Sequence, residues 1–354
     1  MYAGMSNAKN LGDGKNIVAD YRSDTVTKPT AGMRAAMADA LVGDDVYDED
    51  PNAILLEEKL AEMAGMDAAL FLPTGTQSNL AALLSHCGRG DEYIAGDKYH
   101  IFNDEAGGAA VLGGISPFPL PTDEIGGLTP DQIRASIRPD DSHYAISRLL
   151  CLENTVSGRV QPQARIKALA DVAHENGLSV HLDGARIFNA VVASNQSLKA
   201  ICADADSISI CLSKGLGAPI GSVLCGGQEF IRKAKRARKM LGGGMRQVGV
   251  LAACGLYALE NNVARMTQDH ANAKRLAHGL AKIPNLQVDP SAVDTNMVFI
   301  NPGVGHHTNL QTYLARVGII IGLQVPEIRL VTHLDIDEAA IDLTIKYVGD
   351  YFNQ

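Results

Sequence analysis

The chain has 354 residues, of which 46% are hydrophobic and 20% charged, and it contains 35 glycines and 14 prolines. These proportions are typical of a globular protein with many tight turns, and they exclude the disordered, collagen-like and disulfide-rich classes. The formal net charge of −9 argues against binding to a phosphate backbone. No apolar stretch approaches the ~20 residues that span a bilayer. We therefore expect neither a nucleic-acid nor a membrane partner.

The cysteines and the first residues bear on the compartment. Six cysteines occur, none of them in a Cys-x-x-Cys pair, which indicates free thiols and a reducing cytoplasm. Residues 1–16 are small and polar and lack an apolar core, so they are expected to form a flexible extension, not a secretory signal.

From about residue 66 onward, short apolar runs alternate with amphipathic segments. The expected strands, in chain order, are 93–95, 147–152, 178–182, 207–212 and 222–225. The expected helices are 77–86, 129–137, 163–176 and 228–240, followed by a long helical region over 247–283. The basic run 232–239 is expected to be a solvated face of its helix. Such alternation predicts an α/β fold, with a mainly parallel sheet sandwiched by helices.

The pattern changes towards the C-terminus. Shorter elements are expected there, at 295–300, 310–317, 319–321, 328–332 and 337–352. We therefore predict a large domain over 17–265, whose N-terminal segment contributes to the active site. A smaller α+β domain is predicted over 266–354.

Two polar residues follow neighbouring predicted strands. Asp183 comes directly after 178–182, and Lys214 comes 31 residues later, after 207–212. Ligands of open α/β sheets bind at the carboxyl ends of the strands. A lysine there can form an imine with pyridoxal 5′-phosphate (PLP), while an aspartate keeps the pyridine nitrogen protonated. Taken singly, the aspartate also suits a turn or helix cap, and Ser-Lys-Gly also suits a plain loop.

A third motif suits the phosphate of the same cofactor. Gly75 and Thr76 open an expected helix, where free N–H groups, the helix dipole and a hydroxyl favour an anion. The alternative is an ordinary N-cap. No Gly-Lys-Ser/Thr follows, which excludes a Walker P-loop. The ten histidines are not spaced as metal ligands, so no metal is expected. Together, the three motifs predict a PLP site.

The motifs resemble those of the low-specificity L-threonine aldolases, which are PLP enzymes of fold type I (aspartate aminotransferase-like). The resemblance runs from about Tyr21 to the C-terminus. The matching segments, in order, are 22–27 (RSDTVT), 43–47 (GDDVY), 73–77 (PTGTQ), 181–186 (HLDGAR), 212–216 (LSKGL) and 242–247 (GGGMRQ).

The resemblance implies a role for each cofactor residue. It makes Lys214 the Schiff-base lysine and Asp183 the partner of the pyridine nitrogen, with Gly75 and Thr76 on the phosphate. His100 is implied to stack on the ring and to take part in catalysis.

The resemblance also implies residues for the substrate and for a neighbouring subunit. Ser23, Arg186 and Arg329 are expected to hold the substrate carboxylate, for which the arginine fork is suited. Arg186 is expected beside the cofactor as well, and Tyr47 near the site. Lys239 is expected to reach the cofactor of a neighbouring subunit in a homotetramer built from dimers.

The reaction implied is retro-aldol cleavage of L-threonine, L-allo-threonine or a related β-hydroxy-α-amino acid to glycine and an aldehyde. A PLP-dependent β-eliminating lyase or amino-acid racemase on the same scaffold is the alternative. A third possibility is a PLP-binding protein without turnover, although a carboxylate clamp would have no use in such a protein.

Three residues depart from the family pattern. Val156 stands where the family has a histidine that contacts the β-hydroxyl, and valine cannot donate, accept or transfer a proton. Asn103 and Asp104 stand where bulky apolar or aromatic residues are usual. One interpretation is that Asn103 and Asp104 are exposed loop residues and that Val156 is neutral drift. The other is an altered substrate pocket, which has lost its histidine and gained polar groups, and in which Asp104 supplies the missing contact to the β-hydroxyl.

Overall fold

A computed structural model describes residues 17–353 and divides the chain into two compact units. One unit comprises residues 29–261. The other joins residues 262–353 to residues 17–28. The expected flexible extension, 1–16, lies outside the described residues. The boundary near residue 265 stays a prediction, and residues 17–28, which we expected with the large domain, are grouped here with the C-terminal unit.

A seven-stranded sheet is the centre of the 29–261 unit. Its strands, in spatial order, are β2 (Ala68–Leu72), β8 (Ser222–Gly226), β7 (Ser207–Cys211), β6 (Ser179–Gly184), β5 (Ile146–Glu153), β3 (Asp91–Gly96) and β4 (Ser116–Leu120). Only β8 runs antiparallel to its neighbours. Every residue of β7 and β8 is buried, as expected for a sheet covered on both faces. The expected mainly parallel α/β fold is confirmed.

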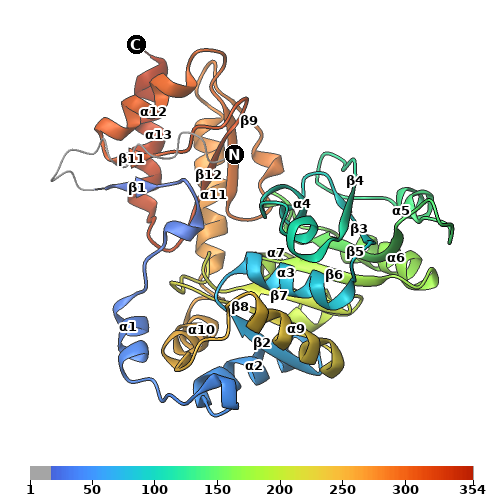
Figure 1. The fold of residues 1–354 in the computed structure, drawn as a ribbon. Helices are drawn as coiled ribbons and strands as arrows, with labels where there is room; N and C mark the ends of the chain where they lie inside the picture. The colour runs from blue at the N-terminus through green and yellow to red at the C-terminus, as the bar shows by residue number, and fades with distance from the viewer. Residues whose placement is uncertain (1–16, 354) are drawn as a thin grey trace. The chain divides into compact units, whose positions relative to one another are not determined.

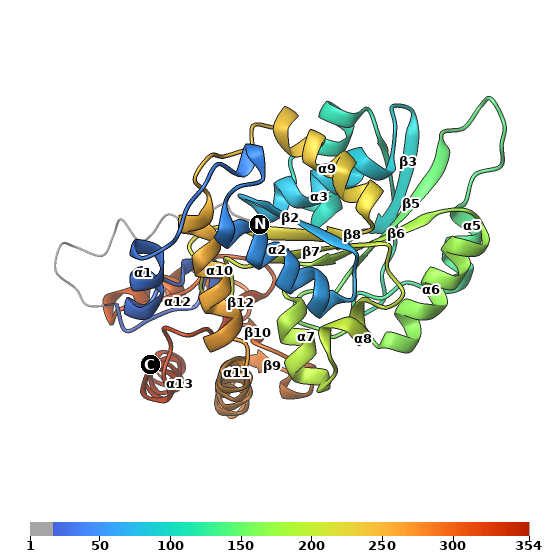
Figure 2. The same cartoon turned by 90° about the horizontal axis from the view of Figure 1, so that it is seen from below.

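Helices cover both faces of this sheet. Figure 2 shows α3 (Gly75–His86) and α9 (Gln228–Met240) on one face, and α6 (Gln163–Glu175), α7 (Ile187–Ser194) and α8 (Leu198–Cys202) on the other. Leu70 and Leu72 of β2 form a buried cluster with alanines of α3 and α9. The remaining helices of the unit are α1 (Ala31–Ala38), α2 (Pro51–Ala64), α4 (His100–Asn103), α5 (Pro130–Ser136) and α10 (Gly249–Asn261).

Two helices show how far local sequence decides the structure. Helix α6 buries Ile166, Leu169 and Ala173 along one face and ends at the expected stop signal, where Gly177 has φ +75°. The basic helix α9 is different. The expectation of a solvated face is wrong for Arg238, which is only 3% exposed. Its buried guanidinium pairs with the carboxylate of Asp45.

Several elements were not expected from the sequence. Strands β2 and β4 and helices α1, α2, α7 and α8 lie outside the predicted ranges. The short apolar run 68–72 does not reveal by its periodicity whether it is a strand or a helix. The long helical region is interrupted, because α10 ends at Asn261 and α11 begins at Met266.

The sheet topology places six strand ends at one edge. Because β8 runs antiparallel to both β2 and β7, those two strands run parallel to each other and to β6, β5, β3 and β4. The carboxyl ends of all six strands therefore lie along the same edge of the sheet.

The second unit, most of whose helices and strands are labelled in Figure 1, has a hydrophobic core of its own. An antiparallel sheet of β9 (Gln287–Val288), β10 (Met297–Asn301) and β12 (Ile328–Val331) packs with α11 (Met266–Leu280), α12 (His307–Arg316) and α13 (Glu338–Phe352). Strand β1 (Ala19–Asp20) pairs in parallel with β11 (Ile319–Ile320). The apolar core joins Ala19 and Tyr21 to side chains of these helices and strands. None of the helices among residues 17–353 is both long and apolar enough to cross a membrane.

Candidate active site

Five residues lie at or just beyond the strand ends that share one edge of the sheet. Gly75 follows β2, His100 follows β3 and Glu153 ends β5. Asp183 is the penultimate residue of β6, and Lys214 follows β7. Four of these were expected site residues, and Glu153 was not. Their convergence follows from the parallel strand directions, which supports the expectation of a site at this edge.

The carboxylate of Asp183 is buried, with a residue exposure of 2%. Its Oδ2 accepts a hydrogen bond from Asn79 Nδ2 at 2.8 Å, and its Oδ1 accepts one from the backbone N–H of Ala185 at 2.9 Å. Both donors are neutral, so they orient the carboxylate without neutralising its charge. A cationic ring nitrogen would supply the missing positive charge, because a buried anion is stable when it is paired with a cation.

His100 is held by a second buried carboxylate. The Oε1 atom of Glu105 lies 2.9 Å from His100 Nδ1 and also accepts from Asn79 Nδ2 at 2.7 Å. The bond to Glu105 raises the pKa of His100 above its ordinary value, and the nearby Asp183 adds to this effect. Burial in turn raises the pKa of Glu105. Asn79 therefore connects the residue expected to stack on the ring with the residue expected to pair with its nitrogen.

Glu153 is a third carboxyl group beside His100. Its Oε2 accepts the backbone N–H of His100 at 2.7 Å. Burial, followed by the charge of Asp183, raises the pKa of Glu153 well above its usual range, while Lys214 opposes this effect. Glu153 was not among the expected site residues, although it directly follows the strand predicted over 147–152.

Lys214 lies half-buried in the loop after β7. Its backbone carbonyl accepts the N–H of Gly217 at 2.8 Å, which closes a turn in which Gly217 has φ +77°. The charge of Lys214 lowers the pKa of both His100 and Glu153, although other influences on each of these groups are larger.

The first turn of α3 is open to a ligand. Thr74 is the N-cap and accepts the N–H of Gln77 at 3.1 Å, so the ordinary capping interpretation is correct for this residue. A Cβ placed on Gly75 would meet nothing within 4 Å. The N-terminal amides of Gly75 and Thr76 thus border open space at the positive end of a helix dipole.

These features fit PLP. The turn at Gly75 suits the phosphate, the buried Asp183 suits a protonated pyridine nitrogen, and Lys214 supplies an amine. His100, Glu105 and Asp183 also offer ligand atoms within 4.8 Å of one another. The hydrogen bonds through Asn79 already account for that closeness.

The expected carboxylate clamp is divided between the two units. Arg329, on β12, donates from Nη2 to the carbonyl of Arg22 at 3.3 Å, which places it beside Ser23. The Oγ of Ser23 accepts the N–H of Thr25 at 3.2 Å. Arg186 belongs to the other unit and precedes α7. The structure brings Arg329 to Ser23, and the three-residue clamp stays a prediction.

Lys239 and the residue before Tyr47 line one hollow. Tyr47 itself is 71% exposed at the end of a short 3₁₀ helix, and Lys239 is exposed in the last turn of α9. The hollow measures about 320 Å³ and is lined by Val46, Arg232, Lys235, Arg236, Arg238, Lys239 and Gly244. Its basic wall agrees with an anionic ligand near Lys239.

The three departures from the family pattern occupy different environments. Val156 is 1% exposed and lies so close to Gly126 that a Cβ there would meet its side chain at 2.3 Å. Asn103 is exposed and bonds to the carbonyl of Asp97, while Asp104 is half-buried at the end of α4. Val156 is therefore tightly packed. Asn103 matches the exposed-position interpretation, and Asp104 does so only in part.

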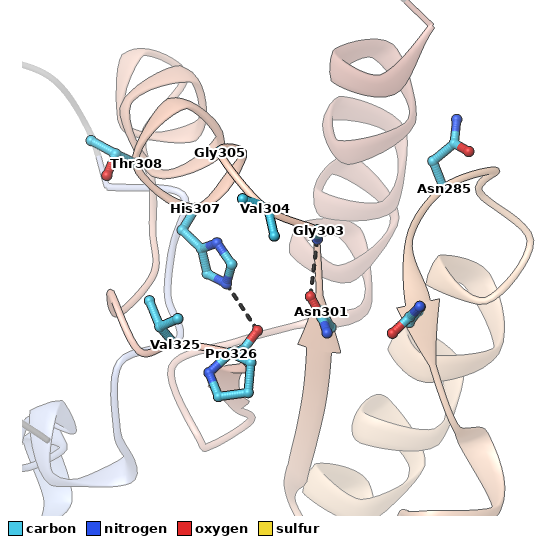
Figure 3. Close-up of a pocket in the computed structure, with 10 residues that line it drawn as sticks. Asn285, Asn301, Gly303, Val304, Gly305, His307, Thr308, Val325 and Pro326 are labelled. Atoms are coloured by element: carbon cyan, nitrogen blue, oxygen red, sulfur yellow. Dashed lines mark hydrogen bonds between the residues drawn. The ribbon is translucent and has the colours of Figure 1, made fainter.

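A separate cavity lies in the C-terminal unit. It measures about 560 Å³ and its lining includes Asn285, Asn301, His307 and Pro326 (Figure 3). The Nε2 atom of His307 lies 2.9 Å from the Pro326 carbonyl. Since none of the expected site residues lines this cavity, it is distinct from the strand-end site.

Comparisons with known proteins agree with this geometry. Residues 20–302 match the family model described as beta-eliminating lyase. The chain is 50% identical over 317 residues to the low specificity L-threonine aldolase of Escherichia coli (strain K12), covering 90% of this chain and 94% of that protein. It is 43% identical over 336 residues to low-specificity L-threonine aldolase 1 of Arabidopsis thaliana, covering 92% and 94%.

A solved structure supports the fold. The threonine aldolase of Leishmania major superimposes with a TM-score of 0.80 over 94% of this chain and 99% of that one, at 19% identity. With the strand-end site and the matched family model, these findings identify the chain as a member of the low-specificity L-threonine aldolase family of PLP-dependent carbon–carbon lyases.

Proposed function

We propose that this chain cleaves L-threonine, L-allo-threonine or a related β-hydroxy-α-amino acid to glycine and an aldehyde. The observation that carries the proposal is the site at the sheet edge. An amine, a buried carboxylate and an open helix N-terminus lie there in a chain 50% identical to a low specificity L-threonine aldolase. These residues fit PLP, which would take up the substrate through its amino group.

In the reaction, the β-hydroxyl loses its proton, the Cα–Cβ bond breaks and the aldehyde departs. The α-carbon then takes up a proton to give glycine. Bound PLP supplies the electron sink for the pair released from the broken bond. Lys214 would hold the cofactor through its amine, and Asp183 would favour a protonated ring nitrogen.

We propose His100 as the residue that handles a proton at this site. With Nδ1 engaged by Glu105 at 2.9 Å, its Nε2 is the nitrogen left for the substrate. Ser23, Arg186 and Arg329 would fix the substrate carboxylate and thereby set which bond lies perpendicular to the ring. Val156 cannot assist at the hydroxyl, so Asp104 is the residue proposed to contact it.

The proposal extends to assembly and compartment. The basic hollow beside Lys239 supports an active site completed by a neighbouring subunit, in a homotetramer built from dimers. All six cysteines are buried free thiols, which supports a reducing cytoplasm.

The test is glycine release. Purified protein would be incubated with L-threonine, L-allo-threonine, L-phenylserine and L-3-hydroxyaspartate, and glycine and aldehyde would be measured. We expect Lys214→Ala to lose release by orders of magnitude, because no amine then holds the cofactor. Lys167→Ala, at an exposed lysine paired with Asp171, should leave it unchanged.

A PLP-loaded protein that gives no glycine from any of these substrates would contradict the proposal. The matched family model makes β-elimination the second candidate. Pyruvate and ammonia from L-serine would identify that reaction, and inversion at the α-carbon would identify a racemase.

A further inference from the structure

A row of hydrogen bonds leads away from Asp183 into the protein. Asn79 Nδ2 lies 2.8 Å from Asp183 Oδ2, and Asn79 Oδ1 lies 3.2 Å from His181 Nε2. His181 Nδ1 lies 2.8 Å from Ser207 Oγ, which lies 2.7 Å from His86 Nε2. The residues come from α3, β6 and β7, which lie side by side (Figure 2). The row therefore links the candidate active site to the last residue of α3.

Almost all of this row is removed from water. His181 and Ser207 are 0% exposed and Asn79 is 2% exposed, while His86 is half-buried and stacks on Phe230 with 4.5 Å between ring centroids. Burial lowers the pKa of His181 to about 3 and that of His86 to about 4. Both imidazoles are consequently neutral at neutral pH, and each has one N–H to donate.

The number of available protons fixes the direction of every bond. Asn79 Nδ2 faces two carboxylate oxygens, from Asp183 and Glu105, so its amide group donates both protons to them. Asn79 Oδ1 is then an acceptor, and His181 must carry its proton on Nε2. His181 Nδ1 is therefore bare and accepts the single proton of Ser207.

The same count continues to the end of the row. Since the hydroxyl of Ser207 donates to His181, its oxygen accepts from His86, which must carry its proton on Nε2. Each donor in the row thus points towards the carboxylate of Asp183. Aligned hydrogen bonds polarise one another, and bonds to an ionised acceptor are stronger than bonds between neutral groups.

We infer that His86, Ser207, His181 and Asn79 form a polarised hydrogen-bond relay that orients the carboxylate of Asp183 for pairing with the pyridine nitrogen of PLP. The inference rests on the proposed role of Asp183 and adds four positioning residues to it. None of the four touches the reacting atoms. Their effect passes through Asn79, whose second amide proton serves the Glu105 carboxylate that holds His100.

The first test reads the protons directly. Protein labelled with ¹⁵N in its histidine rings would be examined by NMR at neutral pH with PLP bound. The signals of His181 and His86 would be assigned with His181→Gln and His86→Gln variants. We expect both rings to be neutral and protonated on Nε2. A cationic ring, or a proton on Nδ1 of either one, would overturn the relay.

The second test breaks the relay at a small side chain. Ser207→Ala removes the bridging hydroxyl, and Ser85→Ala is its matched control, because the buried hydroxyl of Ser85 bonds only to the Ala81 carbonyl in the described structure. We expect Ser207→Ala to lower kcat and PLP affinity by roughly 2- to 10-fold, as suits one hydrogen bond, and to shift the absorption maximum of the bound cofactor.

The comparison between the two variants decides the result. Ser85→Ala should leave the PLP affinity and the absorption maximum unchanged. Equal behaviour of the two variants, with melting temperatures also equal, would overturn the relay as a device acting on the cofactor. The KM for L-threonine should change little in Ser207→Ala, because the relay acts on the ring and not on the carboxylate clamp.

Failure of the relay can be told apart from failure of the proposed function. A native protein that holds PLP but releases no glycine would refute the aldolase reaction, while the histidine protons and the cofactor spectrum would still report on the relay. A native protein that releases glycine, with Ser207→Ala indistinguishable from Ser85→Ala, would refute only the relay.

Discussion

The buried ion pair between Asp45 and Arg238 allows a stability prediction that does not depend on the active site. Arg238 Nη2 lies 2.7 Å from Asp45 Oδ2, and the two side chains are only 4% and 8% exposed. Arg238 also donates from Nη1 to the Phe71 carbonyl at 2.8 Å. Its Nε is buried and has no hydrogen-bond partner within residues 17–353.

The desolvation cost of burying these two charges offsets much of the attraction between them. Burial is the largest influence on the pKa of Asp45 and raises it, despite the opposing effect of Arg238. The folded chain therefore binds the Asp45 proton more tightly than the unfolded chain does. The penalty for the ionised group is fully present above the folded pKa and disappears in acid. Removing one partner strands the other, which costs about 3–5 kcal/mol, whereas removing both costs far less.

A double-mutant cycle measures this difference. We expect Asp45→Leu and Arg238→Met each to lower the free energy of unfolding by about 3–5 kcal/mol, which corresponds to a fall in Tm on the order of 10 °C. The double variant, with two apolar side chains of similar size, should recover most of that loss. Thermal unfolding followed by circular dichroism at fixed protein concentration would supply the values.

The control uses the ion pair on the exposed face of the same helix. Glu229 and Arg232 pair at 2.6 Å with side chains that are 64% and 55% exposed. Glu229→Leu with Arg232→Met should leave Tm unchanged, because water screens such a pair. Additive losses in the Asp45 and Arg238 cycle would refute the reasoning, since they would mean that neither charge depends on the other.

Two further predictions concern the active site. Glu105→Gln should lower the pKa of His100, measured by NMR titration, because the carboxylate that raises this pKa is gone. Glu105→Asp, which keeps a carboxylate, should lower the pKa less. An unchanged pKa in Glu105→Gln would show that Glu105 is not the cause of the raised value. A histidine with a raised pKa stabilises the fold only while it is protonated, so this contribution should fade in the native protein as the pH rises through that pKa. Val156→His and Asp104→Leu should each reorder the kcat/KM values among β-hydroxy amino acids, by roughly tenfold for one lost or gained polar contact; an unchanged ranking in both would contradict the altered substrate pocket.

The main site residues could be predicted because they follow strands that the apolar pattern already marks. Asp183 and Lys214 were found in this way, and the same rule would have found Glu153 at the end of β5. Asn79 could not have been found. It lies inside α3 and gains its importance from a carboxylate 104 residues away, which only the packed sheet brings near.

The fold was predictable to a similar degree. The buried parallel strands and amphipathic helices of the larger unit have clear periodicity, so the α/β class followed from the sequence. Strand β1 has two residues, and its partner β11 lies three hundred positions further along, so no local pattern reveals the pairing. Arg238 was missed because a basic run gives no sign of which cation will meet a buried carboxylate.

The pairing of β1 with β11 also sets the order in which the two units can fold while the chain is synthesised on the ribosome. Residues 29–261 are continuous and contain every strand of the seven-stranded sheet, so this unit can form before synthesis ends. Ala19 and Tyr21, by contrast, belong to a core whose other members lie beyond residue 272. The first described strand of the protein therefore cannot pair until almost the last one has been synthesised, and until then the side chains of Ala19 and Tyr21 remain uncovered.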